Sequence, residues 1–373
     1  MKFKKMSLSL ISVLLLASCG QVNDTSEEST TISSEETTTS TKSAEEVKKE
    51  YIENVEDEFL ASASEVTYTD TTVTFSDANS NEFTLERGVS DVCILYPSFT
   101  TLWYEAGGVA SGVIGGSSAI ELYNEYIGRD ITQDEGVTVL ATSSSGTKWS
   151  TETIIASQPD LIICSTSMSG YSTISAPAEA AEIDCIAVDY ANLGDYLKWF
   201  KVFSLLTNNT DLYETVALNT LSEVAEVIYE CNNSNLESPR VFSMFSGTKS
   251  FTANTRNVLV GSMIETLGAT NIVTEWGETS EERLTIDFEK VYASKPEMIL
   301  IQCHSDTETS SALLESLYGD NELWQAVKSE VGEDNIFWLE KVLYHNKPNS
   351  RFAEAYQNLA KILYPNYTFS FEA

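Results

Sequence analysis

Histidine and basic residues are scarce in this chain of 373 residues, which has 2 His and 22 Lys or Arg against 56 Asp or Glu. Two histidines cannot supply the several imidazoles that a site for a free transition metal would need. The formal net charge of -34 repels nucleic acid and anionic lipid headgroups, so we expect neither as a partner. An anionic ligand would need a locally basic site.

Hydrolase motifs and long apolar runs are lacking as well. No Gly-x-Ser-x-Gly motif occurs, and the stretch from Ser167 to Gly170 lacks the first glycine of one. Beyond a short N-terminal run, no stretch of about 18 or more apolar residues is found, so we expect no transmembrane domain. The chain does not look like an enzyme, although a secreted surface hydrolase or an adhesin remains the alternative of another class.

Six cysteines are present, and their spacings match no zinc pattern. Five of them lie in or beside apolar or helical runs, which favours buried free thiols that pack as small hydrophobic groups. These five are Cys93, Cys164, Cys185, Cys231 and Cys303.

The first 19 residues are typical of a secretory signal peptide. Lysines precede a short apolar run, and Leu16 to Cys19 resembles a bacterial lipobox, in which the cysteine receives the lipid. We therefore expect an extracytoplasmic lipoprotein, anchored to the cell membrane through Cys19. Residues 20–65 are rich in Ser, Thr and Glu and are predicted to be a disordered tether, with some helical character only at residues 45–61.

The remaining chain alternates between apolar strand-like runs and helical segments. Residues 73–85 predict a hairpin, and runs such as Val92 to Tyr96 and Leu161 to Cys164 predict buried parallel strands covered by helices on both faces. Asp195 to Cys231 predicts a long helical region with a break near Asn208 and Asn209.

One sequence unit occurs twice. Glu152 to Ile163 and Glu289 to Leu300 both start with Glu and contain Ala-Ser-x-Pro, an acidic residue and an apolar run. The repeat predicts an α/β fold with two similar Rossmann-like lobes and a ligand cleft between them. The predicted lobes are residues 66–207 and 234–373, joined by a long rigid helix at residues 208–233.

Several segments in this order resemble one family, the helical-backbone class of ABC-importer solute-binding proteins for ferric siderophores, haem and cobalamin. They are the hairpin with Pro97-Ser98, the repeated unit, Phe251-Thr252, Met263 to Ile272, and Asn349 to Pro365. The resemblance covers roughly residues 70–365. It implies a monomer that docks onto a permease dimer, with its ATPase, through one Glu on each lobe, and Glu152 and Glu289 match these positions.

The ligand is expected between the lobes, against loops that follow strand ends. The candidate contacts are aromatic, cationic and polar side chains: Tyr96, Ser98, Ser117, Lys148, Trp149, Tyr171, Phe251, Arg256, Trp276, His304 and Tyr344, with His345 beside the last. The resemblance implies an iron complex as ligand and no intrinsic cofactor. A ferric siderophore is the first choice, because it brings its own metal ligands. Haem, ligated by Met168 and His304, and cobalamin are the alternatives.

Overall fold

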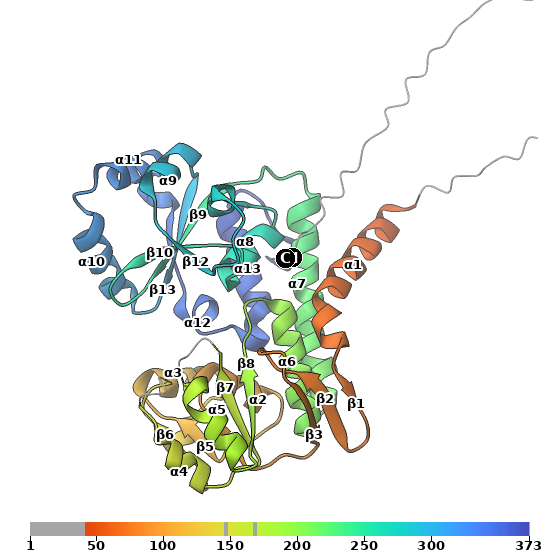
Figure 1. The fold of residues 1–373 in the computed structure, drawn as a ribbon. Helices are drawn as coiled ribbons and strands as arrows, with labels where there is room; N and C mark the ends of the chain where they lie inside the picture. The colour runs from red at the N-terminus through yellow and green to blue at the C-terminus, as the bar shows by residue number, and fades with distance from the viewer. Residues whose placement is uncertain (1–41, 145–147, 167–169, 373) are drawn as a thin grey trace, which may run out of the picture. The chain divides into compact units, whose positions relative to one another are not determined.

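The structure, a computed structural model, describes residues 42–144, 148–166 and 170–372. Two separate β-sheets, each with helices packed on its faces, form an N-terminal and a C-terminal lobe (Figure 1). Both sheets are built around parallel strands, as predicted from the apolar runs, which are buried on both faces. The predicted two-lobed α/β class is therefore confirmed.

The N-terminal lobe contains a five-stranded parallel sheet in the order β6-β5-β4-β7-β8. Its strands are β4 (Val92–Ile94), β5 (Gly112–Ile114), β6 (Thr138–Ala141), β7 (Leu161–Ser165) and β8 (Asp184–Val188). Its helices are α2 (Pro97–Glu105), α3 (Ser117–Tyr126), η1 (Ile131–Gln133), α4 (Thr151–Ala156) and α5 (Tyr171–Ala180). A separate antiparallel sheet precedes it and includes the predicted hairpin: β1 (Thr67–Tyr68), β2 (Thr72–Ser76) and β3 (Glu82–Glu86).

The C-terminal lobe contains a six-stranded mixed sheet in the order β12-β10-β9-β13-β14, with β11 also paired to β9. Its strands are β9 (Arg240–Ser246), β10 (Phe251–Asn254), β11 (Thr270–Asn271), β12 (Arg283–Thr285), β13 (Met298–Cys303) and β14 (Ile336–Leu339). Its helices are α8 (Leu259–Thr266), η3 (Ile272–Trp276), α9 (Phe288–Ser294), α10 (Thr307–Tyr318), α11 (Glu322–Val331), η4 (Glu333–Asn335), α12 (Lys341–Tyr344), η5 (Asn349–Arg351), α13 (Phe352–Leu363) and η6 (Ser370–Glu372).

The repeated sequence unit occupies equivalent places in the two sheets. In one lobe α4 leads into β7, which lies between β4 and β8. In the other α9 leads into β13, which lies between β9 and β14. Both strands are fully buried. The two units are therefore structural counterparts, which is what the sequence repeat predicted.

A helical segment joins the lobes, and it is interrupted where the sequence predicted a break. Helix α6 (Leu193–Leu206) ends before Asn208, whose φ of 59° is left-handed and interrupts the helix. A π-helical turn, η2 (Tyr213–Leu218), then leads directly into α7 (Asn219–Asn233). Buried residues line one side of α7, which packs against the closing helix α13.

Part of the stretch expected to be a disordered tether is a packed helix, α1 (Ala44–Ser64). Its buried residues Val55, Phe59 and Ala63 are spaced four apart and so share one face of the helix. Lys201 of α6 donates hydrogen bonds to the carbonyl oxygen of Ala63 at 2.8 Å and of Val66 at 3.1 Å. The helical character expected at residues 45–61 is thus confirmed, whereas the disordered tether predicted up to residue 65 does not hold from residue 44 onward.

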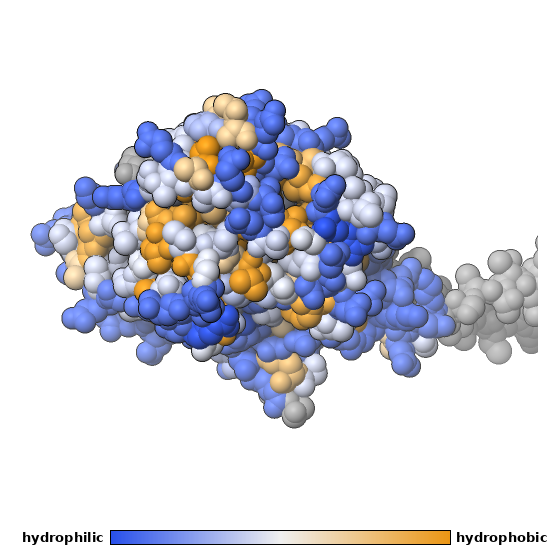
Figure 2. All heavy atoms as spheres, turned by 90° about the horizontal axis from the view of Figure 1, so that it is seen from below, coloured by the Kyte–Doolittle hydropathy of each residue, from blue (hydrophilic) through white to orange (hydrophobic). Residues whose placement is uncertain are grey.

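The described residues contain no helix that is long and apolar enough to cross a membrane. All five cysteines beyond the signal region are buried free thiols, as predicted. The proposed lipidation position, Cys19, lies outside the described residues. Hydrophilic residues cover most of the face shown in Figure 2, in keeping with the excess of acidic side chains.

Candidate ligand-binding site

The candidate site is built from loops that follow the carboxyl ends of parallel strands in both lobes. Tyr96 follows β4 and Asp189 follows β8 in the N-terminal lobe, and His304 follows β13 in the C-terminal lobe. The carboxyl ends of parallel strands meet at one edge of a sheet, where α/β proteins commonly bind ligands. Electrostatic interactions of Tyr96 with Arg283 of β12 show that the two edges lie close together.

The loop between α12 and α13 joins these edges directly. Ser98 donates a hydrogen bond to the carbonyl oxygen of Asn346, and the Tyr126 hydroxyl donates to that of Lys347 at 3.1 Å. The amide nitrogen of Asn349 donates to Thr101 Oγ1 at 2.8 Å. Asn349 is fully buried. Because these bonds fix the loop against the N-terminal lobe, its neighbours His345 and Lys347 are positioned between the two lobes.

Two imidazoles lie side by side in this region. Nδ1 of His304 and Nε2 of His345 are 3.1 Å apart, and the His345 ring stacks on Phe245 with the ring centroids 5.5 Å apart. Burial, together with the neighbouring His304 and the nearby Lys341 and Arg283, lowers the pKa of His345 to about 3. Burial, with Lys341, lowers the pKa of the exposed His304 as well. Both rings are therefore neutral near pH 7, and one donates its N–H to the lone pair of the other. When Nδ1 of His304 is the donor, the lone pair on Nε2 of His304 stays free.

Three cations surround the imidazole pair. Arg283 lies over the face of Phe245, with its guanidinium carbon 4.3 Å from the ring centroid. Its side chain stays 28% exposed, so part of the guanidinium can still reach a ligand. Lys341 and Lys347 also lower the pKa of His345, as does the neighbouring His304. The surroundings of His345 are thus locally basic in a chain whose net charge is -34.

Acidic groups lie on one side of this basic region. The Lys347 ammonium donates to the carbonyl oxygen of Tyr190 and is attracted by Asp189, Glu282 and Asp195, while burial lowers its pKa. Glu282 also pairs with Arg283 at 3.2 Å. The acids therefore balance Lys347, whereas Lys341, which acts on both neutral imidazoles, forms the more positive end of the site.

Comparisons with known proteins identify the family to which this chain belongs. The model of the Periplasmic binding protein family matches residues 93–336, which is more than half of the chain. The chain belongs to the Periplasmic binding protein family. Comparison with curated proteins gave no match. Proteins of this family are extracytoplasmic solute-binding proteins, so the chain is a binding protein and not an enzyme.

Solved structures with the same fold support this assignment. An ABC transporter substrate-binding protein from Listeria monocytogenes EGD-e is 15% identical, with a TM-score of 0.59, and the match covers 74% of this chain and 100% of that one. IsdE of Staphylococcus aureus, complexed with heme, is 13% identical, with a TM-score of 0.61 and coverage of 74% and 99%. The vitamin B12-binding protein BtuF of Vibrio cholerae is 15% identical, with a TM-score of 0.53 and coverage of 74% and 97%.

Of the predicted ligand contacts, the structure brings Tyr96 and His304 to the site of this periplasmic binding protein. Ser98 and Tyr344 lie beside it, but their polar atoms are already bonded within the protein. The Ser98 hydroxyl binds Asn346, and the Tyr344 hydroxyl donates to the carbonyl oxygen of Ala355 at 2.8 Å. Both side chains are buried, so they hold the loop in place and do not face a ligand.

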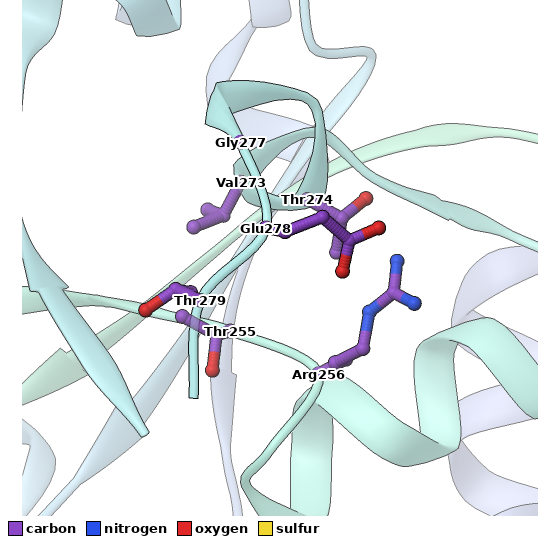
Figure 3. A pocket seen from close by; sticks show the side chains of 7 residues that line it. All are labelled: Thr255, Arg256, Val273, Thr274, Gly277, Glu278 and Thr279. Atoms are coloured by element: carbon purple, nitrogen blue, oxygen red, sulfur yellow. The ribbon is translucent and has the colours of Figure 1, made fainter. Parts of the chain in front are cut away.

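Three predicted contacts of the C-terminal lobe lie elsewhere. Phe251 is 3% exposed and belongs to the hydrophobic core, because β10 turns its side chain to the covered face of the sheet. Arg256 follows the far end of β10, pairs with Glu265 at 3.5 Å and points toward Glu278 (Figure 3). The cavity there has a volume of about 20 Å³, which is room for about one water molecule. Trp276 packs against Phe242 on the outer side of the same lobe.

The remaining predicted contacts of the N-terminal lobe differ in their exposure. Ser117 and Lys148 are exposed, and Trp149 is 8% exposed. Tyr171 is partly buried beside Asn79 of the β2–β3 turn, and burial raises the pKa of its hydroxyl. Met168, the predicted haem partner of His304, lies outside the described residues.

Arg283, Lys341 and Lys347 were not among the predicted contacts. In the sequence Arg283 follows two glutamates and therefore resembles an ordinary surface cation. Its strand β12 is only three residues long, so no strand pattern marked it. The one available signal was the scarcity of basic residues: each of the 22 Lys and Arg in so acidic a chain is a candidate for a special role. That signal does not say which of them meet in space.

The two matched glutamates occupy the same position on equivalent helices. Glu152 is the second residue of α4 and Glu289 the second residue of α9, and both are exposed. Ser150 caps the first helix by accepting from the Thr153 amide, and Asp287 caps the second by accepting from the Glu289 amide. The helix starts are thus fixed by their caps, which leaves both glutamate carboxylates free for another role.

Proposed function

We propose that this chain is the substrate-binding lipoprotein of an ABC importer and captures an anionic iron chelate between its lobes. It would be anchored to the membrane through Cys19 and would deliver the chelate to a permease dimer that works with an ATPase. The family gives the general role of solute capture. The chemistry of the region between the lobes supports the more specific ligand.

The observation that carries the ligand class is the basic region around His345 in a protein of net charge -34. Such a protein repels anions at long range, so an anion binds only where local cations outweigh the rest. Arg283 and Lys341 provide charge and hydrogen-bond donors for carboxylate or catecholate oxygens. Tyr96 and Phe245 provide aromatic surface for the organic part of the ligand.

A ferric siderophore fits this site best, because it surrounds its own iron and needs no metal ligands from the protein. Among the described residues no group of three or more His, Cys, Asp or Glu side chains could hold a bare metal ion. The site thus offers recognition of charge and shape and not a complete coordination shell.

Haem is the second candidate, and one observation favours it. His304 is exposed and, because its pKa is lowered, keeps a neutral imidazole that can donate a lone pair to iron. The carboxylates of a haem would also suit the basic region. Spectra with and without haemin separate the two ligands, since an imidazole bound to haem iron shifts the Soret absorption band.

The ligand proposal is tested by calorimetric titration of the full chain with ferric siderophores, haemin and cobalamin. We expect saturable binding of a ferric siderophore, and Arg283→Met should weaken it about tenfold or more, because one charge-assisted hydrogen bond contributes about 1.5–3 kcal/mol. Arg256→Met is the matched control, since that cation lies far down β10, and should bind as the wild type does. Equal losses in the two variants, or saturable binding of cobalamin alone, would refute the ligand proposal.

Docking onto the permease is proposed to use Glu152 and Glu289. A dimeric permease presents two equivalent surfaces, and the two glutamates are equivalent anions on the two lobes. Charges at the rim of an interface set orientation and the rate of association. The double variant Glu152→Ala, Glu289→Ala should lose uptake of the chelate by cells and keep its affinity in solution. Normal uptake by cells that contain only this variant would rule out the docking role.

A further inference from the structure

An open depression of about 640 Å³ lies on the outer side of the C-terminal lobe, where β12, α9 and the start of α11 meet. We call it the α9 groove; its lining includes the side chains of Trp276, Leu284, Ile286, Phe288, Leu323 and Glu289. Its volume is in the range of sites that take a small molecule or a few protruding side chains.

The floor of the α9 groove is apolar and incompletely covered. Trp276, Leu284, Ile286 and Leu323 pack against the core of the lobe and are only partly buried. Apolar side chains gathered in an open hollow on a protein with 21% charged residues mark a surface that another molecule covers. A single exposed leucine would carry no such meaning, but four neighbouring apolar groups in one hollow do.

The α9 groove is separate from the ligand site. Successive residues of a strand point to opposite faces of the sheet, so Leu284 faces away from Arg283. Arg283 contacts Phe245 and Asn254 on the face that leads to the other lobe. Leu284 packs on the core cluster of the opposite face. A ligand held near His345 therefore does not cover this hollow.

The charges beside the α9 groove indicate what covers it. Glu289 is exposed at its edge in the first turn of α9, and Asp287, which caps this helix, lies 4.0 Å from the Lys290 ammonium. A partner that fits these groups carries an apolar side chain with a basic residue close by. Lys290 stands 5.6 Å from the Trp276 ring centroid and shows that this ring accepts a cation.

We infer that the α9 groove receives an apolar side chain of the permease, next to the basic residue that pairs with Glu289. This inference rests on the proposed docking function, because the same partner contacts both. The apolar contact would supply the affinity of the complex and the Glu289 pair its orientation, as in interfaces where a few buried anchors dominate.

The first experiment fills or empties the α9 groove in the full chain. Lys290, which is exposed, lines the hollow and stands over the Trp276 ring, is replaced by Trp, and in a second variant Leu323 is replaced by Ala. Both should lower uptake of the ferric chelate by about fivefold to thirtyfold, the effect of losing one or two kcal/mol of binding. The matched control is Leu317→Ala, since Leu317 is 43% exposed on α10 and is not part of the groove.

Chelate affinity and thermal unfolding of each variant separate docking from folding. Lys290→Trp removes no core contact, so its effect cannot be a packing defect even if Leu323→Ala is destabilised. If the double glutamate variant stops uptake while Lys290→Trp transports like the Leu317 control, the groove inference is wrong and the docking proposal stands. If the double variant transports normally, the docking proposal itself is wrong.

The second experiment identifies the occupant in living cells. A photoreactive benzoylphenylalanine is placed at position 290 or, as a control, at position 317, and cross-linked products are identified by mass spectrometry. We expect cross-links to a multi-spanning permease subunit from position 290 only. Cross-links from position 290 to any other protein, or to none, would overturn the inference.

Discussion

Glu105, at the junction between the lobes, provides a test of the structure that does not depend on the ligand. It is the last residue of α2, and its carboxyl oxygens accept hydrogen bonds from the Ser350 backbone amide at 3.2 Å and from the Ser350 hydroxyl at 2.9 Å. The carboxyl also acts electrostatically on Tyr126, Tyr190 and Tyr196. Burial raises the pKa of Glu105 from 4.5 to about 8, so the group is protonated near pH 7.

This raised pKa makes the stability of the folded chain depend on pH. The unfolded chain ionises Glu105 near pH 4.5, whereas the folded chain holds the proton until about pH 8. The contribution of Glu105 to the free energy of unfolding is therefore fully present below pH 4.5 and is lost as the pH rises through about 8. A carboxyl whose pKa was lowered on folding would show the opposite dependence.

The change Glu105→Gln replaces the carboxyl with an isosteric amide that stays neutral and can keep both contacts with Ser350. A shift of about 3.5 pKa units corresponds to at most about 5 kcal/mol. Glu105 is partly exposed, so solvent screening reduces the expected effect to about 1–3 kcal/mol. The variant should equal the wild type near pH 4.5 and exceed it in unfolding free energy by this amount near pH 9.

The assay is urea unfolding followed by tryptophan fluorescence at about pH 4.5, 6, 7.5 and 9, with Glu121→Gln on the exposed side of α3 as the control. The control should differ from the wild type by the same small amount at every pH. A difference for Glu105→Gln that does not grow with pH, or that shrinks, would refute the burial of a protonated carboxyl at the junction.

Two further predictions concern α1 and the imidazole pair. Lys201→Met removes both hydrogen bonds from the Lys201 ammonium to the carbonyls of Ala63 and Val66 and should lower the unfolding free energy by about 1–3 kcal/mol. The control Lys198→Met, one turn earlier on α6, should change the unfolding free energy by less than about 1 kcal/mol. Equal losses of stability in the two variants would contradict the packing of α1. Because the pKa of His345 is lowered to about 3, its contribution to stability is present above about pH 6.5 and is lost as the pH falls through 3. The stability advantage of the wild type over His345→Gln in urea titrations should therefore decrease below pH 6.5, and an advantage that grows there would show that the ring is charged.

The architecture could be predicted because several independent signals agreed. Apolar runs marked the buried parallel strands, and the repeat from Glu152 and from Glu289 revealed two equivalent units. The break near Asn208 also agrees with the structure, where this residue has a left-handed backbone. Each of these signals is local in the sequence or is a direct comparison of two segments. None of these three signals depends on how the lobes face each other.

The site was harder to predict because it depends on contacts between distant segments. Arg283 meets Phe245 through a three-residue edge strand, and Lys347 reaches Tyr190 across the lobes. Phe251 was predicted to contact the ligand, because the sequence around an aromatic residue near a strand end does not show whether its ring faces a ligand or the core. The structure decides by the register of β10, which pairs Phe251 with Ser246 and turns its ring to the core.

The central claim, that an iron chelate binds between the lobes beside the basic region, is tested most directly by anomalous X-ray scattering. Crystals of the protein are grown with a ferric siderophore that binds in solution, and data are collected at the iron absorption edge. We predict a single strong iron peak between the lobes, close to Arg283, His304 and His345. An iron peak in the α9 groove or beside Arg256, or a bound chelate without contact to Arg283, would contradict the account.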